Sequence, residues 1–196
     1  MSQAVELQLN SQLSETCNQF RSNSLRVTQF TKELHHHQLN LRMESDRWSI
    51  AECIVHLNLF SEVFLAAIQT ACARARREEL FGDGPYKMDL VGRLLKFALE
   101  PPSKWTAITT ARFEPLVVEP LEKVIPGFIE LQSELIGLVI SSAGLDLNRI
   151  KITSPVSNHV RYNLYSCFQI IAAHQRRHLW QADRSRSFLL SDGMRR

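Results

Sequence analysis

Apolar residues recur at steps of three and four along most of this chain, the spacing that keeps side chains on one face of a helix. The pattern predicts helices over residues 3–34, 49–77, 88–99, 120–143 and 161–185. The alternation typical of strands is nearly absent. We therefore expect an all-α fold in a single domain, residues 1–196, most simply a four-helix bundle with a long crossover and a short additional helix.

The second predicted helix has the clearest start. Ser49 and Glu52 form a capping-box pattern, in which each side chain accepts a hydrogen bond from the other residue's backbone N–H. Trp48, directly before the cap, can staple onto Cys53. The fourth helix is expected to end at Gly144, because glycine readily adopts the left-handed conformation that follows many helices.

The segments between the helices carry weaker signals. Residues 145–163 are expected to form a connection, and residues 103–118 an ordered loop over the end of the bundle. Pro126 lies inside the fourth predicted helix, where it could cause a kink or a later start.

Composition narrows the class of protein. Of 196 residues, 44% are hydrophobic and 22% charged, which is ordinary for a globular domain, and the net charge of +3 gives little support to nucleic-acid binding. No uninterrupted apolar run reaches membrane-spanning length, and the first residues lack a secretory pattern, so we expect a cytoplasmic protein. Cysteines without a CxxC pair predict neither disulfides nor a thiolate zinc site. They are Cys17, Cys53, Cys72 and Cys167.

Histidines supply the candidate chemistry. His174 and His178 lie four residues apart and continue the buried stripe of the last helix, so their rings stack over one another. The pair could hold a metal ion, or could be hydrogen-bonded inside a bundle without one. His56, near the apolar face of the second helix, is a third candidate ligand. The run His35–His37 cannot share one helical face, and we interpret it as exposed.

Two segments resemble a known family. Residues 48–57 read W-S-I-A-E-C-I-V-H-L and residues 174–181 read H-Q-R-R-H-L-W-Q, and both are similar to signatures of the DinB/YfiT-like superfamily. The resemblance covers about residues 5–185. It implies a four-helix bundle in which three histidines hold one divalent metal ion, usually nickel or zinc. Position by position, those ligands are His56, His174 and His178.

The resemblance also implies a choice of reactions. Its characterised members include transferases that use bacillithiol or mycothiol, a maleylpyruvate isomerase, and proteins labelled as metal-dependent hydrolases. Three imidazoles leave a coordination position open, where an ion could lower the pKa of water to about 7 or hold a thiol as its thiolate. We expect thiol-dependent S-transferase chemistry, with a hydrolase or a non-catalytic binding bundle as alternatives. Glu52 is a candidate catalytic carboxylate, although capping also explains it.

The expected partners follow from the same interpretation. We predict a small-molecule substrate, with a low-molecular-weight thiol as a candidate cofactor, and neither nucleic acid nor membrane. The basic run of Arg176, Arg177, Arg184 and Arg186 could receive the carboxylate of such a thiol, or could be a solvated helix face. Phe188, Leu189 and Leu190 near the C-terminus could support a homodimer or fold back onto the domain.

Overall fold

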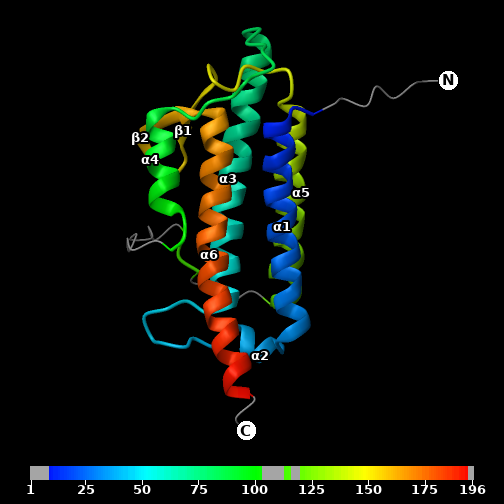
Figure 1. Ribbon diagram of the computed structural model, residues 1–196, viewed down its shortest axis with the longest axis vertical. Helices are drawn as coiled ribbons and strands as arrows, with labels where there is room; N and C mark the ends of the chain where they lie inside the picture. The colour runs from blue at the N-terminus through cyan, green and yellow to red at the C-terminus, as the bar shows by residue number, and fades with distance from the viewer. Residues whose placement is uncertain (1–8, 103–112, 116–119, 194–196) are drawn as a thin grey trace, which may run out of the picture.

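The computed structural model describes residues 9–102, 113–115 and 120–193, and its elements confirm the all-α class (Figure 1). Four long helices build the bundle, and a short helix and a hairpin lie beside them. The helices are α1 (Ser11–Glu33), α2 (His36–Leu39), α3 (Ile50–Arg77), α4 (Leu90–Leu99), α5 (Leu121–Ser141) and α6 (Leu164–Gly193), and the strands are β1 (Lys151–Ser154) and β2 (Ser157–Asn163).

The bundle helices are α1, α3, α5 and α6, and both α5 and α6 pack against α1 and α3 (Figure 1). α3 and α5 run in the same direction, so the chain must return along the bundle between them. That return is the predicted long crossover. It contains α4, the additional helix, which packs against α6.

Two clusters of buried apolar side chains fill the bundle, and the candidate ligands lie where the clusters meet. One cluster includes Phe60 and Ala172, and the other includes Leu57 and Leu179. On α3 the boundary between the clusters falls between Leu57 and Phe60, one residue after His56. On α6 the residues from His174 to His178 lie between the two clusters.

The hairpin corrects the prediction for residues 145–163. β1 and β2 pair antiparallel, with Ile152 opposite Tyr162 and both side chains buried. This inward-facing pair covers the end of the bundle. Burial of its apolar surface stabilises the pairing of the two strands. Asn163 ends β2 and starts α6, because its side-chain oxygen accepts a hydrogen bond from the Ser166 N–H at 2.8 Å. α6 consequently begins at Leu164 rather than near residue 161.

Other boundaries agree with the sequence more closely. The capping box of Ser49 and Glu52 is present, and Gly144 adopts the expected left-handed conformation with φ of +79°. α5 continues through Pro126 from a start at Leu121. α1 begins at Ser11, after the N-cap Asn10, and residues 3–8 of the first predicted helix lie outside the described part. His35–His37 are exposed, as predicted, and two of them belong to α2.

The expectation of no membrane-length segment needs correction. Among the described residues, α3 and α5 are long and apolar enough to cross a membrane by length and composition. Polar residues interrupt both helices, so counting uninterrupted apolar runs missed their high mean hydropathy. In this fold both helices pack within the bundle, and core helices of soluble proteins meet the same criterion.

A polar junction joins α4 to the start of α6. The Asp89 carboxylate accepts hydrogen bonds from the Gly92 N–H at 3.0 Å and from the Asn163 N–H at 2.8 Å, so it interacts with the first turns of both helices. It also pairs with Lys151 at 2.9 Å. Gly92 allows this close approach, because a side chain there would overlap Ser166. The junction fixes the start of α4 against the first turn of α6.

Candidate metal centre

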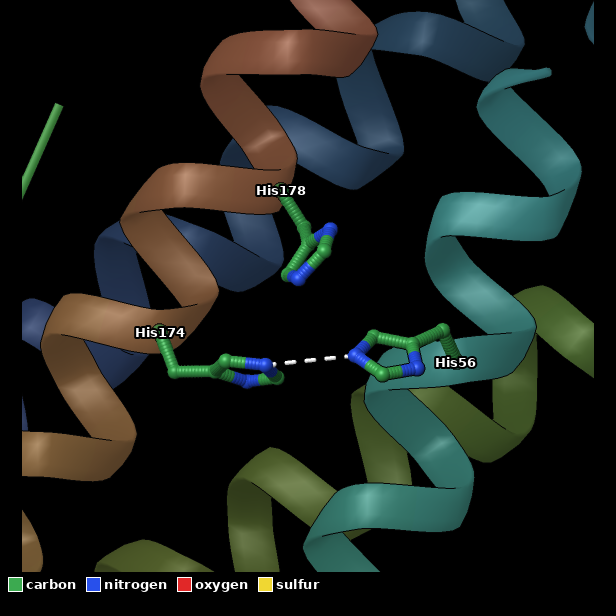
Figure 2. A group of neighbouring side chains, drawn as sticks. All are labelled: His56, His174 and His178. Atoms are coloured by element: carbon green, nitrogen blue, oxygen red, sulfur yellow. Dashed lines mark hydrogen bonds between the residues drawn. The ribbon is translucent and has the colours of Figure 1, made fainter. Parts of the chain in front are cut away.

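Three histidine side chains converge between α3 and α6 (Figure 2). His56 comes from α3, whereas His174 and His178 project from successive turns of α6. One ring nitrogen from each residue can be chosen so that all three lie within 4.8 Å of one another. The side chains are buried, with exposures of 4% for His56 and 7% for each of the others. The structure therefore brings together the three ligands that the resemblance implies.

A backbone carbonyl fixes the orientation of His56. Its Nδ1 lies 2.7 Å from the carbonyl oxygen of Phe113, which can only accept a hydrogen bond. In the neutral ring Nδ1 must then carry the proton, which leaves a lone pair on Nε2. That atom lies 3.2 Å from Nε2 of His174 (Figure 2). The contact with Phe113 is the kind of outer hydrogen bond that commonly orients a histidine ligand.

Aromatic rings surround the histidines. Trp48 lies 4.8 Å from His56 and 5.7 Å from His178 between ring centroids, and Phe60 stacks on His174 at 3.9 Å. The sequence suggested only a staple role for Trp48. In the structure this indole covers two of the three imidazoles, so it also shields them from water.

Burial keeps the three imidazoles neutral. Desolvation lowers the pKa of His56 below its ordinary value of 6.5, and it lowers the pKa values of His174 and His178 well below 6.5. The neighbouring imidazoles and the positive charge of Arg177 add to the effect on His174 and His178. All three rings consequently present lone pairs at neutral pH, as metal ligands must.

The donor set fits a divalent ion. Two imidazole nitrogens bound to one zinc-like ion are about 2.8–3.4 Å apart, for bond lengths of about 2.0–2.1 Å and angles between about 90° and 109°. The 3.2 Å between the Nε2 atoms of His56 and His174 falls in this range. Among the described residues, buried Nδ1 atoms of His174 and His178 have no hydrogen-bond partner. Burying polar nitrogens without hydrogen-bond partners costs folding free energy, and such atoms in a native structure call for a functional explanation.

A comparison with protein families identifies the chain. The family model described as the DinB superfamily matches residues 19–182, which include both signature segments and all three histidines. The chain belongs to the DinB superfamily. Comparisons with curated proteins and with solved structures gave no match. The family and the histidine cluster together fit a metal-binding DinB-like protein.

Glu52 is engaged at the start of α3 of this DinB-superfamily protein. Its carboxylate accepts hydrogen bonds from the Ser49 N–H at 2.8 Å and from the Arg42 guanidinium. Burial raises the pKa of Glu52, but these hydrogen bonds outweigh burial and the net pKa is lowered. A carboxylate of lowered pKa is a weak base. Its catalytic role stays a prediction, whereas its capping role is confirmed.

The structure gives different roles to the cysteines and to the aromatic residues of the loop. All four cysteines are buried free thiols, and burial raises the pKa of Cys53 to about 12, so it suits the core rather than nucleophilic attack. Phe113, predicted only as a loop aromatic, supplies the carbonyl that orients His56. Trp105 and most of the loop over residues 103–118 lie outside the described residues.

Acid is expected to destabilise the metal-free protein through these histidines. In the unfolded chain they bind protons below about pH 6.5, whereas the folded pKa values are lower. The unfolded state therefore binds more protons below that pH, and the free energy of unfolding falls by up to about 1.4 kcal/mol per pH unit for each histidine. This stability is complete above pH 6.5 and is lost as the pH falls toward the folded values.

Urea unfolding between pH 7.5 and 5 after chelation would measure this slope. In the matched variant His178→Leu the free energy of unfolding should depend less steeply on pH, by the contribution of about one proton. The exposed histidines are the same in both proteins and cancel in this comparison. Identical slopes would contradict the assignment of buried, neutral imidazoles.

Proposed function

We propose that His56, His174 and His178 hold one divalent ion, nickel or zinc, and that the protein is a metal-dependent thiol S-transferase. One observation carries the proposal. Three neutral imidazoles from α3 and α6 face a common point, and the Phe113 carbonyl holds the His56 lone pair toward it. Imidazole suits both metals, and three protein ligands with an open position are typical of catalytic rather than structural sites.

The surroundings support chemistry on a thiol. A bound ion would supply Lewis-acid stabilisation of a thiolate at neutral pH. Trp48 and Phe60 exclude water from the histidines and offer apolar surface to a substrate. In the proposed reaction a sulfur–carbon bond forms, the bond from carbon to its leaving group breaks, and the thiol proton goes to solvent.

The predicted homodimer, cytoplasmic location and small-molecule substrate remain proposals. Leu189 and Leu190 fold back onto the second apolar cluster, which leaves Phe188, 55% exposed, as the apolar side chain of that segment available to another surface.

Metal analysis of protein purified without a histidine tag tests the centre. We expect about one nickel or zinc ion per chain after gel filtration. The exposed run His35–His37 could bind metal adventitiously, so the variant with all three changed to alanine is the necessary control and should retain the same ion. Absence of stoichiometric metal, or its loss in this control, would contradict the proposal.

Activity of the loaded protein separates the two reactions. N-acetylcysteamine with 1-chloro-2,4-dinitrobenzene reports thiol transfer, and p-nitrophenyl acetate without thiol reports hydrolysis. We expect turnover only when thiol is present. Ester hydrolysis that is independent of thiol would favour the hydrolase, and no turnover with either substrate would favour the non-catalytic bundle.

A further inference from the structure

The outer face of α4 is apolar. Leu90, Leu94 and Phe97 follow one another at steps of four and three residues, so they share one side of this helix. They are 63%, 61% and 79% exposed, and Val91 beside them is 40% exposed. The other exposed large apolar residues in the described part of the chain lie singly on their elements. α4 therefore carries the main apolar patch of that part, and such patches mark interaction surfaces.

The packing of α4 leaves this face outside the core. On the inner side Leu95 and Leu99 contact the apolar cluster that includes Phe60, and Gly92 lies against Ser166. α4 packs mainly against α6 and β2 and lies beside the four bundle helices rather than among them (Figure 1). The inner face is thus already packed, and the outer face forms an apolar ridge that the described residues leave uncovered.

Positive charge borders the ridge. Arg93 lies about 40° around the helix from Phe97, and Lys87 precedes Leu90 by three residues. Both cations are exposed, and neither pairs with a carboxylate among the described residues. The carboxylates at the two ends of α4 are already paired, Asp89 with Lys151 and Glu100 with Arg176. An apolar ridge bordered by cations is typical of a helix that lies in the surface of an anionic membrane.

Other occupants fit the ridge less well. A two-fold pairing of α4 with a second copy through Leu94 would place Arg93 next to its own counterpart, where like charges repel. A different protein would have to supply a groove for a single protruding helix. A bilayer requires neither arrangement, because its acyl chains adapt to apolar side chains and its phosphates accept hydrogen bonds from arginine.

We propose that the outer face of α4 binds the surface of a membrane that contains anionic lipids. Leu90, Leu94 and Phe97 enter the boundary between headgroups and acyl chains, and Lys87 and Arg93 contact the lipid phosphates. We thereby depart from the expectation, drawn from the sequence, of no membrane partner. Apolar spacing predicted the helix, but it does not show which face of a short helix stays exposed.

Sedimentation of the full chain with vesicles tests this binding. The probes are vesicles of phosphatidylcholine alone and vesicles with about 30% phosphatidylserine, in about 0.1 M salt. We expect the protein to bind the anionic vesicles and to bind the neutral ones about tenfold more weakly or less. The double variant Leu94→Ser/Phe97→Ser should weaken binding to the anionic vesicles by at least about tenfold. Arg93→Gln should weaken it about fivefold.

Two matched variants control for general effects. Leu25→Ser changes a leucine of α1 that is 72% exposed, and Lys123→Gln changes an exposed cation of α5. Both should bind vesicles like the wild-type protein. All of these side chains lie at the surface, where substitutions rarely disturb folding.

Three results would overturn the proposal. One is wild-type protein that does not bind the anionic vesicles, and another is binding that the changes on α4 leave intact. The third is a dimer, without vesicle binding, that Leu94→Ser/Phe97→Ser dissociates, because a second copy would then cover the ridge. The variants keep all three histidines, so none of these results bears on the metal centre.

Discussion

Replacing His178 with leucine is expected to abolish tight metal binding and, at the same time, to stabilise the metal-free protein. The loss of affinity should be at least about a hundredfold, because removing even a hydrogen-bond partner of a ligand costs 10–100-fold. The gain in stability has a separate cause. Nδ1 of His178 is buried without a hydrogen-bond partner, and leucine places an apolar side chain of similar size against Trp48. Removing an unsatisfied buried nitrogen should contribute about 1–2 kcal/mol.

His174→Leu is the matched comparison. It should lose metal equally, but it also removes the partner of His56 Nε2 and leaves that nitrogen buried without a hydrogen bond. Its metal-free stability should therefore change little, because one unsatisfied atom replaces another. Thermal unfolding in chelator, together with metal titration, measures both properties. If His178→Leu is less stable than wild type in chelator, the histidine would have a structural role in the core.

Together, these two expected results mean that the metal ligands lower the stability of the metal-free fold. On α6 two buried histidines lie between the two apolar clusters, at positions where apolar side chains would join the clusters into one core. Proteins commonly keep such locally unfavourable residues where function requires them. In this protein the unfavourable residues are three histidines whose ring nitrogens face one another. We therefore attribute the stability lost by burying them to a role in metal binding.

The helices and the ligands could be predicted because their signals are local. A four-residue spacing places His174 and His178 on one face of a helix, and the Ser49 cap fixes where α3 begins. The pairing of α3 with α6 came from the resemblance, since periodicity does not specify which helices are neighbours. The family match and the histidine cluster confirm that step.

The features that sequence reasoning missed depend on contacts between distant segments. A backbone carbonyl has no side-chain signature, so nothing in the sequence marks Phe113 as the partner of His56. Trp48 occupies a staple position, and only the packing of α6 against α3 brings its ring over His178. The hairpin was missed because β1 has only four residues, too few for a convincing alternation.

Gly92→Ala is expected to be the most destabilising single-methyl change in the described helices. A Cβ at this position would overlap both Oγ and Cβ of Ser166, and it would also crowd the Asp89 carboxylate at 3.1 Å. Relief requires α4 to move away from α6, which would strain the hydrogen bond that the Asn163 N–H donates to the Asp89 carboxylate. We expect a loss of about 2–3 kcal/mol in the free energy of unfolding, at the upper end for overpacking, despite the better helix propensity of alanine.

Gly137→Ala provides the control, because that glycine is also helical but a Cβ there meets nothing within 4 Å. It should stabilise the protein by about 0.5–1 kcal/mol through propensity alone, so the two substitutions should differ in sign. Adding Ser166→Gly to Gly92→Ala removes both overlapping atoms, and the double variant should recover part of the loss. Denaturant unfolding of the four proteins measures these effects.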